Sequence, residues 1–170
     1  MIFFVAFTDR NYSINIFNSC ALDYVASLGV KGVCLSPELN ANAISAIRSD
    51  IPVEIIAYGR VPVMTVQNCI VKSAVDRCGC SMDKPYFLKD RKGAQFPVYT
   101  DRHSCTNTIY NSAPIYMADR MDKLDLRGIS ELRFVFTTET KQEISKVLEM
   151  YKENREADFD FTRGHYFRGV

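Results

Sequence analysis

The clearest indication of the architecture is the stretch "VEIIAYG" at residues 53–59, a short and mostly apolar run that ends at a glycine. A run of this kind, bounded by turn residues, is typical of a strand that is buried on both faces of a parallel sheet. Residues 40–49 precede it with the spacing of a helix, and Asn40 is a candidate for the N-cap of that helix. The chain therefore places a helix before a buried strand.

The same alternation continues on both sides of this stretch. The predicted strands are "IFFVAF" (2–7), "KGVCLS" (31–36), "VEIIAYG" (53–59) and "ELRFVFTT" (131–138). The predicted helices are 18–29, 40–49 and 140–154, with Gly29 as the stop signal of the first. Apolar strands that alternate with helices indicate a parallel sheet covered by helices.

Four such βα units are half of an eightfold barrel, a fold that typically takes about 250 residues. The chain has 170 residues and is too short to close a barrel alone. We therefore predict an α/β fold in the form of a partial TIM-like barrel. The expected partner is the remainder of the barrel or a second copy of the chain, and a fragment of a longer protein is the favoured interpretation.

Roughly seventy residues between the third and fourth strands break the alternation, which favours an inserted functional subdomain over a loop. This insertion contains a predicted β-hairpin, in which "PYFLKD" and "QFPVYT" flank the turn "RKGA". A short amphipathic segment at 117–128 leads back to the last unit. The predicted division is 1–63 for the first βα units, 64–116 for the cysteine-containing hairpin subdomain, and 117–170 for the final βα unit and tail.

The net charge of +1 gives no global attraction toward nucleic acid or anionic lipid. We interpret the local basic stretches "LKDRKG" and "TRGHYFRGV" as a solvated hairpin turn and a polar tail. No segment approaches the ~18 consecutive apolar residues of a membrane helix, and the first residues lack the marks of a signal peptide. We therefore expect a cytoplasmic protein with no membrane partner, in a compartment where disulfides are uncommon.

Four of the six cysteines are grouped within the insertion. Cys69, Cys78 and Cys80 lie in "VQNCIVKSAVDRCGC" (66–80), and Cys105 follows. Four thiolates can hold zinc or an iron–sulfur cluster, and Gly79 would let two of the sulfurs face one point. The spacing is not that of paired C-x2-C knuckles, so ordinary apolar roles for some of these cysteines stay open. Cys20 and Cys34 are expected to be buried and inert.

Polar residues follow the predicted strands, where ligands bind in parallel α/β folds. Glu38 follows the second strand and Arg60 follows the third, and these two are the candidate catalytic residues. A carboxylate and a guanidinium at neighbouring strand ends suit a polar or carboxylate ligand, although the two side chains could instead pair with each other. The remaining strand-end residues are Asp9, Arg10, Asn15, Asn18, Ser36, Tyr58, Thr137, Thr138 and Glu139.

A hydrolase of the serine or cysteine type needs a histidine base near its nucleophile. The chain has two histidines, His103 and His165, and contains neither a G-x-S-x-G elbow nor an H-E-x-x-H motif. His103 lies two residues from Cys105 and could serve as a further metal ligand or as a neighbour of one. The residues by themselves give little support to hydrolysis.

Seven segments, taken in order, resemble the barrel domain of the collagenase-like peptidases, peptidase family thirty-two of those with unassigned catalytic type. They are "NIFNS", "LSPELN", "VEIIAYGRVPVMTVQNC", "YFLKDRKGAQFPVYTD", "CTNTIYNS", "LRFVFTTET" and "FTRGHYFRGV". The resemblance implies a TIM-like barrel, of which this chain would be the C-terminal half.

The resemblance implies two kinds of activity. Some members of the family are described as collagenases or secreted proteases, and others as iron–sulfur proteins that support oxygen-independent hydroxylation of RNA bases or of a quinone precursor. In the second branch four cysteines hold a [4Fe–4S] cluster, and Cys69, Cys78, Cys80 and Cys105 are their counterparts here. The tight C-x-C step departs from that branch, so Cys69 and Cys105 match best. The remaining alternative is a non-catalytic module with a structural zinc or cluster site.

Overall fold

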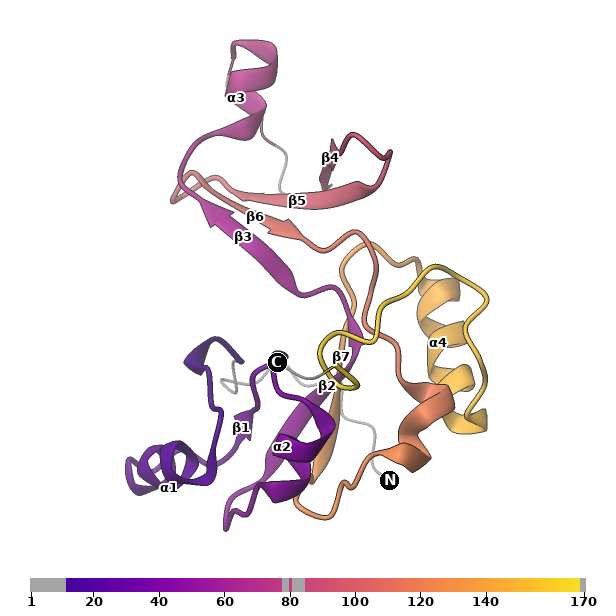
Figure 1. Cartoon of the computed structure of the whole chain (residues 1–170). Helices are drawn as coiled ribbons and strands as arrows, with labels where there is room; N and C mark the ends of the chain where they lie inside the picture. Colours follow the sequence, from indigo (N-terminus) through magenta and orange to yellow (C-terminus); the bar gives the residue numbers. More distant parts are fainter. Residues whose placement is uncertain (1–11, 78–79, 81–84, 169–170) are drawn as a thin grey trace. The chain divides into compact units, whose positions relative to one another are not determined.

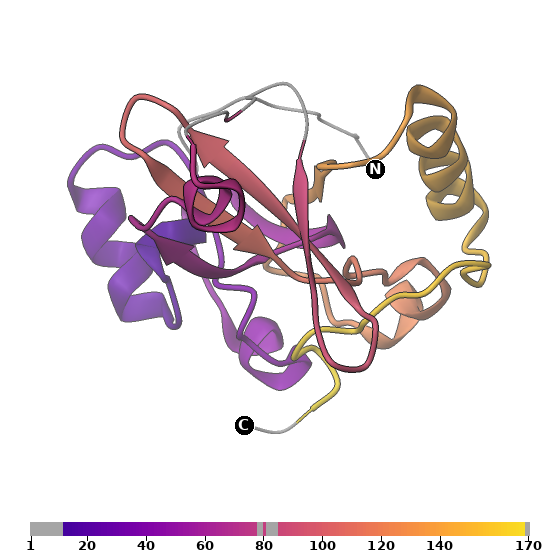
Figure 2. The same ribbon diagram turned by 90° about the horizontal axis from the view of Figure 1, so that it is seen from above.

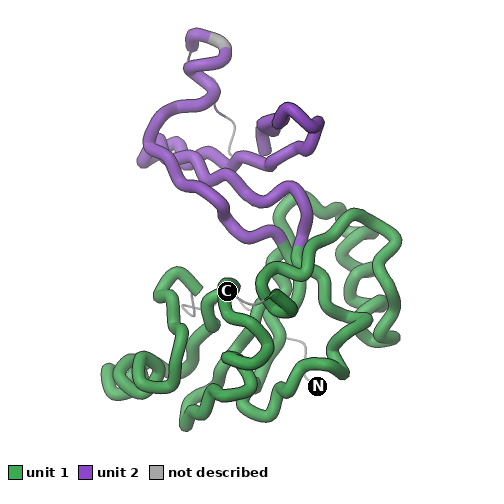
Figure 3. Tube along the Cα trace, in the orientation of Figure 1, with its two compact units in different colours: residues 1–59, 115–170 green, residues 60–114 purple. Residues whose placement is uncertain are grey.

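The structure is a computed structural model that describes residues 12–77, 80 and 85–168. It divides into two compact units (Figure 3): unit 1 comprises residues 1–59 and 115–170, and unit 2 comprises residues 60–114. Each unit has its own sheet.

Unit 1 contains three strands, three α-helices and two 3-10 helices among its described residues (Figure 1). They are η1 (Tyr12–Ile14), α1 (Ser19–Ser27), β1 (Val33–Cys34), α2 (Ala41–Ala46), β2 (Val53–Gly59), η2 (Ala118–Lys123), β7 (Glu131–Val135) and α4 (Lys141–Glu153). The described elements of unit 2 are β3 (Pro62–Val66), α3 (Ile70–Val75), β4 (Tyr86–Lys89), β5 (Gln95–Asp101) and β6 (Thr106–Tyr110).

The sheet of unit 1 has the order β1-β2-β7, and both pairings are parallel. All seven residues of the central strand β2 are buried, as its apolar sequence predicts. Figures 1 and 2 both place α1 and α4 on opposite sides of the three strands. The mixed α/β class and the parallel sheet are therefore confirmed.

The helices of unit 1 begin where side-chain caps satisfy their first backbone N–H groups. The side chains of Asn18 and Asn40 accept hydrogen bonds from the third residues of α1 and α2, so the predicted N-cap Asn40 is confirmed. Helix α4 starts with a capping box, in which Thr140 and Glu143 bond to each other's backbone N–H groups.

Helix α4 packs on the sheet through a buried tyrosine. The hydroxyl of Tyr151 donates to the carbonyl of Ala57 in β2 at 2.5 Å and accepts from the backbone N–H of Met117 at 2.8 Å. Its ring lies edge-on to those of Phe134 and Tyr116. Because both hydrogen-bonding functions of the hydroxyl are used, this polar group is buried without penalty.

A buried ion pair crosses the sheet from β2 to β7. Arg133 Nη2 lies 2.6 Å from Glu54 Oε2, and Arg133 Nε donates to the same oxygen at 2.7 Å. The Glu54 side chain is 4% exposed, so the pair is held in a largely desolvated position. Cys34 lies in register with Glu54, and burial raises the pKa of its thiol to about 12. Cys34 is thus the buried, unreactive thiol that the sequence predicts.

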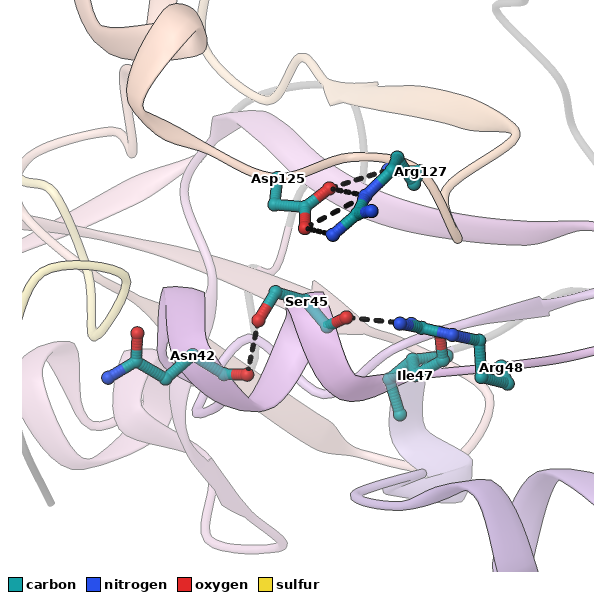
Figure 4. Close-up of polar contacts among 6 residues, drawn as sticks. All are labelled: Asn42, Ser45, Ile47, Arg48, Asp125 and Arg127. Carbon is teal, nitrogen blue, oxygen red and sulfur yellow. Dashed lines mark hydrogen bonds and ion pairs between the residues drawn. The ribbon is translucent and has the colours of Figure 1, made fainter.

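The carboxyl end of α2 is closed by an arginine (Figure 4). Arg48 Nη1 donates to the carbonyls of Ser45 and Ile47, both at 2.7 Å. The segment after η2 packs against the same turn, because a Cβ at Gly128 would lie 2.5 Å from the Ile47 carbonyl oxygen. A glycine is therefore needed there for close packing.

The two chain segments that flank unit 2 are joined by backbone hydrogen bonds within unit 1. The N–H of Gly59 donates to the carbonyl of Ile115 at 3.2 Å, and the N–H of Ile115 donates to the carbonyl of Gly59 at 2.8 Å. Gly59 has φ +128°, and a Cβ at this position would lie 2.1 Å from the Val135 carbonyl oxygen. Only glycine can occupy this position without displacing β7.

The interpretation of "TRGHYFRGV" as a solvated tail is wrong for its described part. Arg163 forms a two-pronged ion pair with Asp119, and Tyr166 is 3% exposed, with its hydroxyl donating to the carbonyl of Ile56 at 2.7 Å. Thr162 forms a bridge with Ile115. Arg163 and Tyr166 therefore attach this segment to the core of unit 1, whereas His165 and Arg168 are exposed.

Unit 2 is built on an antiparallel sheet with the order β3-β6-β5-β4. Strands β4 and β5 form the predicted hairpin, with Asp90 in the turn accepting from the backbone N–H groups of Lys92 and Ala94. The turn residues Lys89, Arg91 and Lys92 are exposed, as expected of a solvated turn.

The TIM-like barrel is not confirmed. Within residues 12–77, 80 and 85–168 the parallel strands form an open three-stranded sheet and close no barrel. The predicted strand 2–7 lies outside the described residues, and the predicted division into 1–63, 64–116 and 117–170 stays a prediction. No helix in the described part of the chain is long and apolar enough to cross a membrane.

Candidate functional site

The sheet of unit 2 brings two of the four candidate ligand cysteines to one end. Strand β3 ends at Val66, and Val66 pairs with Asn107 near the beginning of β6 in an antiparallel ladder. Cys69 follows β3 by three residues, and Cys105 directly precedes β6. Because the end of one strand lies beside the start of the other, both cysteine segments lie at the same end of the sheet.

A third cysteine lies next to the first. The sulfur atoms of Cys69 and Cys80 are 3.8 Å apart, and Cys80 is 7% exposed. Cys69 is the N-cap of α3, and its sulfur accepts from the backbone N–H of Lys72 at 3.3 Å. This hydrogen bond, together with a weaker one from Cys80, lowers the pKa of the Cys69 thiol. A thiol with a lowered pKa is deprotonated more easily, and the thiolate is the form that binds a metal.

A buried asparagine holds the two cysteine segments in place. Asn107 is fully buried, and its side-chain nitrogen donates to the Asn68 carbonyl at 2.6 Å and to the Cys105 carbonyl at 3.5 Å. Its side-chain oxygen accepts from the hydroxyl of Thr100 at 3.1 Å. One amide therefore fixes the backbone directly before Cys69 and at Cys105. The sequence reasoning missed this residue, because its contacts arise only when β3 pairs with β6.

The donor set is suited to a thiophilic metal. Cys105 is exposed and has φ +53°, so its side chain stands at the surface of the turn before β6. A metal bound at about 2.3 Å by two tetrahedrally arranged thiolates would hold them about 3.8 Å apart, the separation found for Cys69 and Cys80. Among the described residues no group of three or more metal-binding side chains is assembled, and Cys78 lies outside them with Gly79.

Cys20 differs from its prediction. It is exposed on α1, so the expectation of a buried, inert thiol is wrong for this residue. Within that helix Leu22 is the residue that turns into the core. The apolar neighbours of Cys20 misled the prediction, because Leu22 faces the core while Cys20 lies on the exposed side of the same helix.

In unit 1, the carboxyl ends of β2 and β7 bring together a tyrosine and a glutamate from the polar strand-end residues. The hydroxyl of Tyr58 donates to Glu139 Oε1 at 3.1 Å, and Glu139 Oε2 accepts from the backbone N–H groups of Thr137 and Thr138 at 2.6 and 3.0 Å. Phe136 packs on the Tyr58 ring. This pair stands where parallel α/β folds bind ligands.

The two candidate catalytic residues belong to different units. Glu38 is exposed in the loop after β1, where its N–H donates to the hydroxyl of Ser36 at 3.4 Å. Arg60 is half-buried and is the first residue of unit 2. Their roles stay predictions.

The geometry of a nucleophile with a histidine base is not found among the described residues. The side chains of His103 and His165 make no hydrogen bond to a serine or cysteine there, and the backbone N–H of His103 donates to Asp101 at 2.9 Å. The prediction that His103 acts as a metal ligand remains untested.

Comparison with known proteins gives a family and no individual relative. No curated protein matches the chain, and neither does any solved structure. The model of peptidase family U32 matches residues 10–164. This match covers all the motifs on which the resemblance to the collagenase-like peptidases was based, apart from the last residues of the tail. The protein therefore belongs to peptidase family U32.

Proposed function

We propose that this protein is an iron–sulfur-dependent enzyme of the U32 family that acts in oxygen-independent hydroxylation of an RNA base or a quinone precursor. Cys69, Cys78, Cys80 and Cys105 are the proposed ligands of a [4Fe–4S] cluster. The observation that carries the proposal is that unit 2 places Cys69, Cys80 and the segment of Cys105 at one end of its sheet, with the buried side chain of Asn107 bonded to two of these segments.

The residues present suit a cluster by their chemistry, because thiolates are the usual ligands of iron–sulfur clusters. When bound, such a cluster supplies one-electron chemistry. The chain's own part is to hold the sulfurs as thiolates and to fix their spacing. The backbone N–H of Lys72 serves the first purpose at Cys69, and Asn107 serves the second.

Glu38 and Arg60 are the proposed substrate-binding residues. Arg60 would bind a carboxylate co-substrate through its guanidinium, and Glu38 would position the acceptor. An Arg60→Ala variant that keeps its ligand binding and its activity would remove the first of these roles.

The proposal is tested by iron, zinc and acid-labile sulfide analysis of protein purified without oxygen, together with its visible spectrum. We expect iron and sulfide in the wild-type protein and their loss in Cys69→Ser and Cys105→Ser. Cys20→Ser is the matched control, since Cys20 is an exposed cysteine of unit 1. Iron that is kept in both ligand variants, or no metal at all, would refute the proposal.

A structural zinc site is the second candidate, because the 3.8 Å between the sulfurs of Cys69 and Cys80 matches one edge of the tetrahedron of sulfur ligands around zinc. It predicts zinc without sulfide, and metal removal that unfolds unit 2 without loss of any activity. The proteolysis implied by the family name predicts instead that peptide cleavage survives substitution of all four cysteines.

A further inference from the structure

The two units differ in the sign of their charge. Residues 60–114 contain eight Lys or Arg and four Asp, a formal charge of +4. The remaining residues contain thirteen Lys or Arg and sixteen Asp or Glu, a formal charge of −3. The net charge of +1 conceals this division, and a basic unit is what a polyanion would recognise.

Most of the described basic side chains of unit 2 form no ion pair with a carboxylate. Every ion pair between described residues lies in unit 1: Arg127–Asp125, Arg133–Glu54, Lys146–Asp158, Arg155–Glu153 and Arg163–Asp119. In the described part of unit 2, by contrast, six exposed cations form no ion pair. They are Lys72, Arg77, Lys89, Arg91, Lys92 and Arg102.

The acidic residues of the two turns bond to atoms of the turns themselves. Asp90 accepts from the backbone N–H groups of Lys92 and Ala94, and Asp101 accepts from the N–H of His103 and the hydroxyl of Ser104. Both carboxylates therefore shape the turns instead of pairing with the neighbouring cations. The exposed cations of the turns can therefore form ion pairs with an anionic ligand.

The cations stand at both ends of one strand. Lys89, Arg91 and Lys92 surround the turn before β5, and Arg102 follows β5 directly. Seven residues of strand separate the two groups, which corresponds to about 24 Å. Figure 1 shows the two turns at opposite ends of β5. An extended anionic chain, and not a single small anion, fits this spacing.

Between the two groups, at the Arg102 end, lies an open cavity of about 420 Å³ lined by Tyr99, Thr100, Asp101, Ser104, Thr106 and Thr108. Tyr99 pairs with Thr108, and Asp101 with Thr106, so these four side chains share one face of the sheet. The cavity is lined by Tyr99, whose ring lies edge-on to that of Tyr110, and by the hydroxyls of Thr106 and Thr108. The hydroxyls of Thr100 and Ser104 already donate to Asn107 and Asp101. A ribose or base can use the ring of Tyr99 by stacking and the hydroxyls of Thr106 and Thr108 by hydrogen bonding.

The carboxylate of Asp101 decides which part of such a ligand enters the cavity. Its two oxygens already accept hydrogen bonds from the backbone N–H of His103 and the hydroxyl of Ser104. A phosphate would be repelled there, whereas the hydroxyls of a ribose or the amino group of a base would be accepted. Hydroxyls and a carboxylate are also a poor lining for inserted lipid chains.

We propose that unit 2 binds single-stranded RNA across strands β5 and β6, with the phosphates on the cations of the two turns and a nucleoside in the cavity at Tyr99. This inference deepens the proposed function, on which it rests for the choice of RNA, since it selects a polynucleotide over a quinone precursor. None of the proposed cluster ligands lines the cavity, and Cys105 lies between two residues that do, Ser104 and Thr106.

The test is binding of a fluorescent uridine-rich RNA of about 12 nucleotides, measured by anisotropy over a range of KCl concentrations. The triple variant Lys89→Gln, Arg91→Gln, Lys92→Gln should weaken binding at least tenfold and reduce the salt slope by about two. The matched control is Lys31→Gln, Lys141→Gln, Lys152→Gln, which removes three exposed charges from unit 1 and should leave binding unchanged. Tyr99→Leu should weaken binding about five- to a hundredfold at an unchanged salt slope.

Equal losses in the two triple variants would mean a simple effect of net charge and would overturn the inference. Binding to phosphatidylserine vesicles in place of RNA would overturn it as well. Metal and sulfide are measured on the same preparations, so the two proposals fail separately. RNA binding without iron refutes the cluster, and iron without RNA binding refutes this surface.

Discussion

Gly59 is the residue on which the geometry of unit 1 makes the strictest demand. Its φ of +128° is outside the range of ordinary side chains, and the carbonyl oxygen of Val135 occupies the place of a Cβ. It also carries both backbone hydrogen bonds to Ile115. Conformation and packing therefore both require glycine, and a displaced backbone here would also weaken the two hydrogen bonds to Ile115.

We expect Gly59→Ala to lower the free energy of unfolding by about 2–4 kcal/mol, because a Cβ 2.1 Å from an oxygen must displace β7. Urea unfolding followed by circular dichroism measures the change. Gly29→Ala is the control: Gly29 has φ +85° with nothing within 4 Å of an added Cβ, so it carries only the conformational cost of about 1 kcal/mol. Equal losses in the two variants would contradict the proposed clash.

The ion pair of Arg163 with Asp119 predicts a dependence of stability on pH. Hydrogen bonds from Arg163 lower the pKa of Asp119 below its ordinary value of 3.8. The pair therefore stabilises the fold fully above about pH 4 and is lost as the pH falls through the lower, folded-state pKa.

Arg163→Gln should lower the free energy of unfolding at pH 7 by about 1–3 kcal/mol and flatten the loss of stability below pH 4. Unfolding curves between pH 2 and pH 7 measure both effects. Lys146→Gln is the matched control, because Lys146 and Asp158 are paired but both are exposed, and it should change little. A steep acid limb in Arg163→Gln would show that other carboxylates govern it.

Among the secondary-structure elements, β6 has the largest effect on the candidate metal site. It is the strand that carries Asn107 between the segments of Cys69 and Cys105. Its position at the centre of the sheet, between β3 and β5, keeps that amide out of water.

We expect Asn107→Leu to reduce the metal content of protein purified without oxygen by at least half, with all four candidate ligands intact. The reason is that the Asn68 and Cys105 carbonyls would lose their donor, and the cysteine segments their common support. Thr65→Val is the control, since Thr65 is an exposed residue of the neighbouring strand β3. Full metal content in Asn107→Leu would show that the cysteines need no such support.

The sequence predicted best those elements whose local sequence pattern matches their burial or their capping in the structure. The strand predicted over 53–59 is β2 with the same bounds, because an apolar run is what a buried central strand requires. The start of α4 follows from Thr140 and Glu143, which form a capping box. Strand β3 was not predicted, because most of its side chains are exposed and so its residues show no alternation.

The sequence predicted the candidate metal ligands of the site, because cysteine is recognisable by its type alone. Cysteines in one insertion gave the grouping of Cys69 with Cys80, which lie together. Asn107 was missed because its role depends on long-range pairing of β3 with β6, which no local pattern reports. The ion pair of Arg163 was missed for the same reason, since its partner is 44 residues away in the chain.

For the molecule as a whole, the two units have separate cores. Val98 is fully buried in unit 2, while Met150 and Tyr151 are buried in unit 1. We expect Val98→Ala to speed hydrogen exchange within 60–114 more than in the rest of the chain, as measured by mass spectrometry of peptides. Met150→Ala is the reciprocal variant and should have the opposite distribution. Uniform acceleration in both variants would mean that the units unfold as one.

The bridge between Gly59 and Ile115 also has an evolutionary consequence. The backbone on either side of the 55 residues of unit 2 is held within hydrogen-bonding distance by unit 1 itself. The entropy of closing the intervening segment grows only slowly with its length, so unit 1 can accept a long or a short segment there at nearly the same cost. Recombination at this position could exchange one recognition module for another and leave the parallel sheet unchanged.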